Sequence, residues 1–254
     1  MRIDKFISNN SEYSRTQVRR LVKAGRVELN NEVVADASMK ITGNNPLVSI
    51  HGQPLEAVGD VYYMLNKPKG YVCANSDGHY PTVIDLLADH HRSKGGRAPC
   101  DSGRLNALQV VGRLDVDTTG LVLLTNNGEW NHHMTSPKSN FFKCYQVSLN
   151  KAPTEATQKL FSEGLLLEGE KKKTKPAYLE FIATKKVRVS ITEGKYHQVK
   201  RMFAAVGCRV RALHRESIGP IRLDAQLHPG EYRELYPCEV ASVENSPLLT
   251  SEPL

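Results

Sequence analysis

The apolar residues near the N-terminus follow a helical spacing. Val18, Leu21 and Val22 recur three and four positions apart, and this spacing predicts a helix that buries one face. Ser14 is a suitable N-cap for this helix, and Gly25 is placed to end it. The segment therefore predicts a short amphipathic helix that packs against the rest of a small unit.

Two further elements complete this unit. A shorter helix is expected near residues 3–9. The turn-forming pair Asn30 and Asn31 separates residues 26–30 from residues 32–34, and this arrangement predicts a β-hairpin directly after the capped helix. Residues 1–50 are thus predicted to form a small domain of their own.

The remaining sequence contains more predicted strands than helices. The apolar run 61–65 predicts a buried strand, and apolar–polar alternation at 145–149 and 187–191 predicts two strands with one inward face each. Helices are predicted at 153–163 and about 196–206, each followed by a glycine. Because strands and helices do not alternate strictly, the sequence favours the α+β class over a doubly wound sheet.

Composition suggests where the chain divides. Residues 51–60 contain Gly52, Pro54 and Gly59 and are predicted to be a linker. Residues 61–245 are then predicted to be a larger second domain, and residues 246–254 a flexible tail. The segment 88–108 is rich in His, Arg, Gly and Ser without periodicity, so a long surface loop is expected there.

The charge of the chain favours an anionic partner. Its 254 residues include 34 Lys and Arg against 27 Asp and Glu, a formal net charge of +7, and nucleic acid is the first candidate. The five cysteines form no C-x-x-C pair, which argues against a disulfide framework and a zinc knuckle. Neither an apolar leader nor a run of about 18 apolar residues is present, so a soluble cytoplasmic protein is expected.

Cations of the capped helix could bind such a partner. Arg15, Arg19 and Lys23 recur every four residues and therefore share one helix face, which Lys5 and Arg20 can widen. The alternative is a solvated basic face without a ligand, and periodicity alone does not decide between the two.

The segment Gly112–Thr125, GRLDVDTTGLVLLT, carries the main candidate for catalysis. Two carboxylates, Asp115 and Asp117, sit in a polar turn that leads directly into an unbroken apolar run. Charges at the head of a buried strand destabilise the fold unless they are paired or functional. The alternative is an Asx-type turn that satisfies its own backbone.

Other chemistries of this turn are less well supported. An aspartic-protease-like dyad needs two matching D-T/S-G turns that share a proton, and the basic composition and unpaired cysteines of this chain disagree with that class. A two-metal nuclease using Asp115 and Asp117 would need more carboxylates nearby. The adjacent pairs His90-His91 and His132-His133 lack an acidic ligand set, so no metal site is predicted.

The N-terminal segment resembles the S4 RNA-binding domain. The motifs that carry the resemblance are RIDKFI, SRTQVRRLVKAGRV and the following hairpin, over residues 1 to about 42. The resemblance implies RNA binding by the helical face, through salt-sensitive contacts to phosphates. The residues expected to make these contacts are Lys5, Arg15, Arg19, Arg20 and Lys23.

The second domain resembles the RsuA/RluB branch of the pseudouridine synthases. The motifs NKPKG, GRLDVDTTGLVLLT, KCYQV and EGKYHQVKRM occur in that order along the chain. The resemblance implies a mixed, mostly antiparallel sheet with flanking helices. It also implies isomerisation of a uridine in RNA, through an extruded base and without metal or organic cofactor.

The resemblance also assigns roles to single residues. Asp115 is expected to be the catalytic acid, and Lys200 the cation that pairs with it, since a partly shielded carboxylate needs a nearby positive charge to stay ionised. Tyr145 is expected to stack on the uracil, Arg113 to help displace the target base, and Thr118 to support the site. The alternatives are a solvated Lys200, an ordinary core tyrosine and a structural ion pair of Arg113.

The resemblance finally implies a substrate. The expected partner is ribosomal RNA or a small-subunit assembly particle, with a 16S rRNA uridine as the target and a monomeric enzyme. The alternatives are a large-subunit rRNA enzyme of the same family and a non-catalytic S4-type ribosome-assembly factor.

Overall fold

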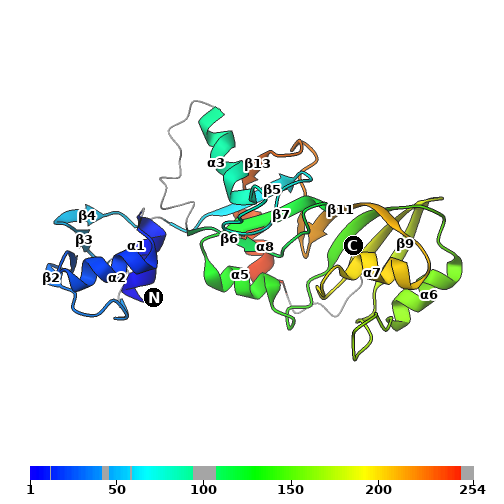
Figure 1. Cartoon of the computed structure of the whole chain (residues 1–254), viewed down its shortest axis with the longest axis horizontal. Coiled ribbons are helices and arrows are strands. Elements are labelled where there is room, and N and C mark those ends of the chain that lie inside the picture. The colour runs from blue at the N-terminus through cyan, green and yellow to red at the C-terminus, as the bar shows by residue number, and fades with distance from the viewer. Residues whose placement is uncertain (12, 42–45, 58, 94–106, 247–254) are drawn as a thin grey trace. The chain divides into compact units, whose positions relative to one another are not determined.

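A computed structural model describes most of the chain, and Figure 1 shows the order of its elements. The described residues are 1–11, 13–41, 46–57, 59–93 and 107–246. The chain separates into two compact units: Met1–Val61, Ile84–Gln109 and Thr125–Asn127 form the first, and Tyr62–Val83, Val110–Leu124 and Gly128–Leu254 the second. None of the helices in the described ranges is long and apolar enough to span a bilayer.

The first unit begins with the two predicted helices, α1 (Ile3–Asn10) and α2 (Arg15–Lys23). Ser14 caps α2 as predicted. Its hydroxyl accepts from the Gln17 amide at 3.4 Å, and the Gln17 side chain accepts from the Ser14 amide at 2.8 Å. Gly25 follows the helix with a positive φ of 66°, a conformation that glycine adopts at little cost.

The sheet of the first unit has the order β2-β1-β3-β4. Its strands are β1 (Val27–Leu29), β2 (Glu32–Val33), β3 (Val48–Ile50) and β4 (Gln53–Leu55). The predicted hairpin is confirmed, with both Asn30 and Asn31 at positive φ. β4 was not predicted: it lies within 51–60 and pairs with β3, because His51 and Gly52 form a tight turn at positive φ.

The apolar face of α2 packs into the core of this unit. Val18 and Val22 are buried there beside Ile3 and Ile7 of α1, as the helical spacing predicted. Leu21 is half-buried at the edge of the same core. This burial leaves the opposite face of α2 in solvent.

The second unit contains a mixed sheet of the order β13-β5-β7-β11-β8-β10-β9, with β12 beside β11 and β6 beside β7. β7 and β11 run parallel, whereas β8 is antiparallel to β10 and β11, β9 to β10, β12 to β11, and β13 to β5. The α+β class is confirmed. The strands are β5 (Tyr62–Lys67), β6 (Gln109–Val111), β7 (Thr119–Thr125), β8 (Lys143–Leu149), β9 (Tyr178–Ala183), β10 (Lys186–Ile191), β11 (Val210–Ile218), β12 (Ile221–Arg222) and β13 (Tyr232–Glu234).

Two of its helices match the predictions and two were missed. α6 (Glu155–Glu163) and α7 (Gln198–Ala205) lie within the predicted ranges, although α7 begins later than expected because His197 adopts a left-handed conformation. α5 (Gly128–Thr135) and α8 (Pro237–Glu244) are short, with few apolar residues at helical spacing. They pack their buried residues, Trp130 and Met134 of α5 and Val243 of α8, into one core with β5 and β7.

The predicted surface loop at 88–108 is partly wrong. Helix α3 (Val83–Ser93) covers its first residues and buries Val83 and Leu87, one turn apart. Residues 94–106 lie outside the described part of the chain, as do residues 247–254 of the predicted tail.

Gly120 of β7 leaves no room for a side chain beside β11. Gly120 has a φ of 101°, and a Cβ atom there would lie 2.3 Å from the carbonyl oxygen of Arg215. Only glycine, which has no side chain, fits this parallel pairing of β7 and β11. The pairing in turn sets the position of the turn that precedes β7.

Replacing Gly120 by alanine is expected to destabilise the protein by at least about 3 kcal/mol, since the new methyl group meets backbone that cannot yield. The measurement is chemical denaturation of both variants. Gly70→Ala is the matched control: Gly70 also has a positive φ, 92°, but its Cβ would meet open space. The Gly70→Ala variant should lose only about 1 kcal/mol of free energy of unfolding. Equal losses would show that backbone conformation, and not the close approach, matters at Gly120.

Candidate active site

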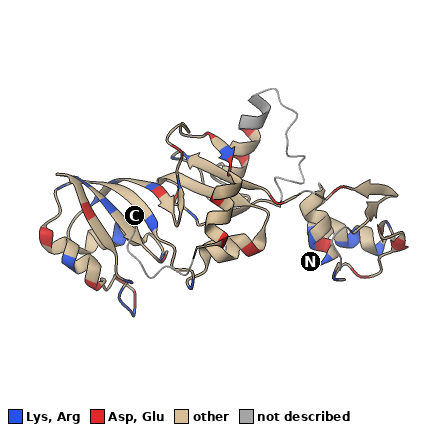
Figure 2. Ribbon diagram, turned by 180° about the vertical axis from the view of Figure 1, so that it is seen from behind, with Lys and Arg blue, Asp and Glu red and all other residues tan. Residues whose placement is uncertain are grey.

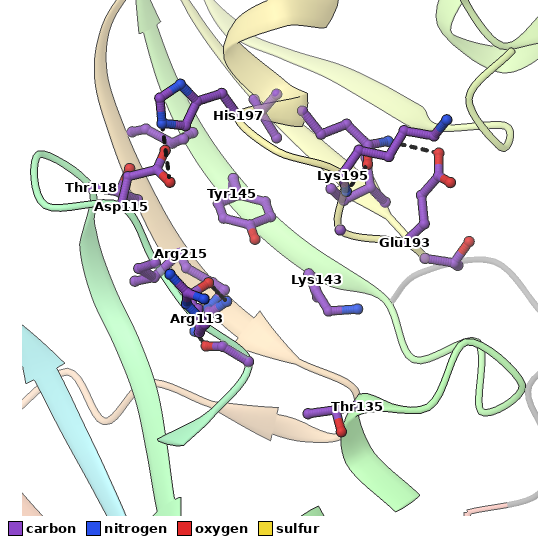
Figure 3. Close-up of a pocket in the computed structure, with 18 of the residues that line it drawn as sticks. Arg113, Asp115, Thr118, Thr135, Lys143, Tyr145, Glu193, Lys195, His197 and Arg215 are labelled. Atoms are coloured by element: carbon purple, nitrogen blue, oxygen red, sulfur yellow. Dashed lines mark hydrogen bonds and ion pairs between the residues drawn. The ribbon is translucent and has the colours of Figure 1, made fainter. Parts of the chain in front are cut away.

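A cavity of about 510 Å³ opens in the second unit beside the polar turn that precedes β7. Residues of β6, α5, β8, β10 and β11, the loop that leads into α7, and the first turn of α7 complete its wall. Asp115, Lys143, Tyr145, His197 and Arg215 all line this one cavity (Figure 3). Segments far apart in the sequence thus supply one site.

A buried lysine holds the turn that carries Asp115. Lys67, at the end of β5, is fully buried, and its Nζ donates to the carbonyl oxygens of Thr118 at 2.8 Å and Asp115 at 3.1 Å. The same Nζ lies 3.0 Å from the carbonyl oxygen of Pro68. The turn is further closed by the Thr118 amide, which donates to the Asp115 carbonyl at 3.1 Å.

Lys67 is held in place by carbonyl dipoles. Burial lowers the pKa of Lys67, and the carboxylates of Asp117 and Asp115 partly oppose that shift. Hydrogen bonds from a charged donor are about twice as strong as neutral ones, which offsets part of the desolvation cost. The NKPKG motif contains Lys67, but its role in the turn was not predicted.

Arg215 is the second buried cation, and it holds the other side of the turn. It is 1% exposed, and its guanidinium donates to the carbonyl oxygens of Gly112 at 2.6 Å and Leu121 at 2.8 Å. The centre of the guanidinium lies 6.0 Å from the ring centroid of Tyr145. Arg215 was not predicted, although a cation two residues from the buried Leu213 on the same face of a strand was a usable signal.

The carboxylate of Asp115 faces a lysine and a histidine. Its Oδ2 accepts from Lys200 Nζ at 2.9 Å, and its Oδ1 lies 3.5 Å from His197 Nε2. The side chain of Asp115 is 31% exposed, against 62% for that of Asp117. Asp115 is therefore the more shielded acid, and it is the one that lines the cavity.

Lys200 bridges the two acids of the turn. Its Nζ also donates to Asp117 Oδ1 at 2.6 Å. Burial alone would lower the pKa of Lys200, but the hydrogen bonds to Asp117 and Asp115 outweigh it and raise the pKa. Burial would likewise raise the pKa of Asp117, yet the bond from Lys200 prevails and lowers it. The expected pairing of Lys200 with Asp115 is thus present in the structure, and Lys200 is not a freely solvated helix residue.

His197 was not predicted either. It precedes α7 with a φ of 48°, and its ring stacks on Tyr196 with centroids 3.9 Å apart. This conformation turns the imidazole toward Asp115 (Figure 3). A continuous helix from residue 196, as predicted, would not have required that turn.

The other expected site residues take different positions around the cavity. Tyr145 is buried on β8, and Arg113 lines the cavity with an exposed side chain that makes no ion pair within the described ranges. Thr118 is 1% exposed, and its hydroxyl finds no partner among the described residues. All three line the same cavity as Asp115.

The expected RNA-binding cations lie in the first unit. Four of them belong to α2, and Lys5 belongs to α1; Figure 2 shows the basic residues gathered along these helices. Arg15, Arg19, Arg20 and Lys23 are exposed, and Arg19 lies 3.6 Å from the buried Asp4.

No group of three or more His, Cys, Asp or Glu side chains that could hold a metal occurs in the described ranges. His133 contacts the carbonyl oxygen of Val243 at 3.2 Å and packs its ring edge against Phe141. These contacts give His133 a structural role in the fold. The side chains of His90 and His91 lie outside the described part.

Lys143, which also lines the cavity, has a pKa well below the usual value of a lysine. Burial, together with the charges of Arg215 and Lys175, lowers its pKa from 10.5 to about 8. Between pH 8 and 10.5 the unfolded chain keeps a proton that the folded protein has lost, so the free energy of unfolding should rise with pH in this window. Below pH 8 both states are charged, and the buried charge destabilises the fold.

Lys143→Met is expected to remove this dependence. Between pH 8 and 10.5 the free energy of unfolding of the wild type should rise by up to about 3 kcal/mol relative to that of the variant. The reason is that one pKa unit corresponds to about 1.36 kcal/mol. Urea denaturation at a series of pH values measures both curves. Parallel curves would show that Lys143 is solvated in the folded protein.

Comparisons with known proteins bear on this site. Residues 61–205 match the family model of RNA pseudouridylate synthase, and residues 1–46 match that of the S4 domain. The chain is 47% identical over 244 residues to the ribosomal small subunit pseudouridine synthase A of Yersinia pestis, covering 96% of this chain and 98% of the relative. It is 46% identical to the protein of the same name from Escherichia coli K12, covering 96% and 100%.

A solved structure agrees with these sequence matches. The crystal structure of a pseudouridylate synthase superposes with a TM-score of 0.67 at 41% identity, and the match covers 96% of this chain and 99% of the other. Because family model, relatives and structure coincide over nearly the whole sequence, the chain belongs to the RNA pseudouridylate synthase family.

Proposed function

We propose that this protein converts one uridine of small-subunit (16S) ribosomal RNA to pseudouridine, with Asp115 as the catalytic residue. The observation that carries the proposal is the position of Asp115: its carboxylate lines the cavity, is 31% exposed, and has Lys200 Nζ at 2.9 Å. The family match makes the enzyme an isomerase that acts on RNA.

The reaction needs no redox partner. The N1–C1′ bond of uridine breaks, the uracil turns, and a C5–C1′ bond forms; C5 loses a proton and N1 gains one, so the atoms of the nucleotide are conserved. A carboxylate can add to C1′ or can promote elimination from the ribose, and both routes require the charged form. Lys200 supplies positive charge 2.9 Å from one oxygen of this carboxylate, and His197 lies 3.5 Å from the other.

Neighbouring residues support the uridine in this proposal. Tyr145 presents its ring in the cavity, where the uracil could stack on it, and its hydroxyl is available to the proton at C5. Arg113, exposed at the cavity wall, is suited to fill the place of the extruded base. The buried hydroxyl of Thr118, without a partner among the described residues, could bond to the bound nucleotide.

The first unit supplies affinity for the RNA. The exposed cations of α2, with Lys5 of α1, form a surface suited to phosphates, and such contacts position an RNA without choosing its sequence. The proposed enzyme works as a monomer in the cytoplasm, on rRNA or a small-subunit assembly particle, and without a cofactor.

The choice of rRNA rests on the relatives. The proteins from Yersinia pestis and Escherichia coli that match 96% of the chain are named for the small ribosomal subunit. Large-subunit enzymes of the family are the second candidate, and the position of the modified uridine separates the two.

Loss of Asp115 should abolish the modification. In cells lacking the protein, carbodiimide-dependent primer extension should show one missing pseudouridine in 16S rRNA, restored by the wild type and not by Asp115→Asn. In vitro the variant should lose at least about 10³-fold in kcat, since the amide has no negative charge to contribute. An unchanged Tm of the variant controls for folding.

Two results would contradict the proposal. A missing site in 23S rRNA would assign the protein to the large subunit. Unchanged rRNA in both subunits would instead indicate a binding protein that assists ribosome assembly.

Lys200 should be replaceable by arginine and not by an apolar residue. Lys200→Met removes the cation from between Asp115 and Asp117, and kcat is expected to fall by about 10²-fold. Lys200→Arg keeps the charge and can bond to both carboxylates, so it should stay within about tenfold of the wild type. Single-turnover rates at saturating RNA measure both variants, and equal losses would show that the shape of lysine matters more than its charge.

A further inference from the structure

A second groove, of about 540 Å³, lies in the second unit on the other side of Lys200. Its wall comes from the end of α7, the start of β11, and Lys69 in the turn after β5. We call it the β11 groove. Four cations line it, Lys69, Lys200, Arg209 and Arg211, together with one acid, Asp117.

The β11 groove adjoins the catalytic cavity. Lys200 and Leu213 line both, so a chain that leaves the cavity past Lys200 enters the groove directly. The acid of the groove does not oppose an anion strongly, because Asp117 is paired with Lys200 at 2.6 Å. The groove therefore continues the site with a surplus of positive charge.

Three of its cations have no acidic partner within the described ranges. Lys69, Arg209 and Arg211 are exposed, and none makes an ion pair with a described residue. Other arginines of this unit are neutralised: Arg188 pairs with Glu180 and Glu216, and Arg233 with Asp224 and Glu239. Unpaired cations gathered in a groove are suited to a polyanion.

The floor and edge of the groove suit a nucleic-acid backbone. Ala204, Gly207 and Ala212 are small, so a phosphate can approach the protein closely. A further cation lies at the edge, since Lys151 Nζ is 3.7 Å from the place of a Cβ on Gly207.

From these observations we infer that the β11 groove binds the phosphates of the single-stranded RNA that flanks the target uridine. The inference rests on the proposed function and adds a second contact surface to it, distinct from the helices of the first unit. A single strand is the expected occupant because the target base must leave its stack. RNA-binding proteins commonly bind unpaired segments, whose bases can be splayed out. Lys69, Arg209 and Arg211 then contact backbone and not the reacting uridine.

The test compares two variants of the full-length protein with equal loss of charge. In the groove variant Lys69, Arg209 and Arg211 become alanine. In the control variant Lys159, Lys185 and Lys186 become alanine; these lysines are exposed and line neither the cavity nor the groove. Binding of a uridine-containing, single-stranded 16S rRNA fragment is measured over a range of salt concentrations, and an unchanged Tm confirms that each variant is folded.

The groove variant should bind roughly tenfold or more weakly than the control variant at ~0.1 M salt. Its plot of log affinity against log salt concentration should be shallower than that of the control variant by about 2 units of slope. The reason is that three phosphate contacts are lost and each contact to a single strand contributes about 0.7. Its kcat at saturating RNA, followed by tritium release from [5-³H]uridine, should stay within about threefold of the wild type. A slope and Kd equal to those of the control variant would overturn the inference.

A duplex arm tests the nature of the occupant. Pairing the fragment with its complement should weaken binding by the wild type to the level of the groove variant. Duplex that binds as tightly as single strand would overturn the assignment. If the wild type releases no tritium from rRNA while the groove variant still loses slope, the rRNA reaction is wrong and the groove stands as an RNA-binding surface.

Discussion

The catalytic domain depends on two buried cations that bind backbone carbonyls. Lys67 and Arg215 donate to carbonyl oxygens on both sides of the turn that carries Asp115, at 2.6 to 3.1 Å. An unmatched buried charge would destabilise the fold by several kcal/mol, so the turn can hardly leave these donors without partial unfolding. The close approach of Gly120 to the backbone of Arg215 fixes the same turn from the sheet. The strand pairing and the two cations thus act on one short segment.

The charged side chains at the surface of this turn pair with one another and not with backbone carbonyls. Lys200 is shared by Asp115 and Asp117, and it lines both the catalytic cavity and the β11 groove. One cation therefore links the chemistry to the proposed path of the RNA. The buried cations donate to neutral carbonyl groups, whereas Lys200, which is 24% exposed, binds the carboxylates. Such a division leaves the charge of Asp115 at the cavity where we propose that the uridine binds.

Local signals predicted the parts of the fold that local sequence determines. Ser14, Gly25 and the pair Asn30 and Asn31 set the ends of α2 and the first hairpin through their own backbone preferences. Strands β8 and β10 followed from alternation. In contrast, α5 and α8 are stabilised by neighbours distant in sequence, so a single-sequence pattern did not indicate them. β4 was missed for another reason: it is a three-residue strand that contains Pro54, although its partner β3 is close in sequence. The gathering of Asp115, Tyr145 and Lys200 was expected only from the family resemblance. Arg215 and His197 were missed, because their roles come from a strand pairing and from one left-handed residue.

The carbonyl of Asp115, and not its carboxylate, is what Lys67 holds. These bonds to the turn therefore do not involve the side chain proposed to perform the reaction. A protein of this design can lose its acid in evolution and keep the folded site, the basic helices and the groove. Chemistry and RNA binding are separable properties here, and a descendant without Asp115 would remain a well-folded RNA-binding protein, free to be selected as a chaperone or a competitor of its active relatives.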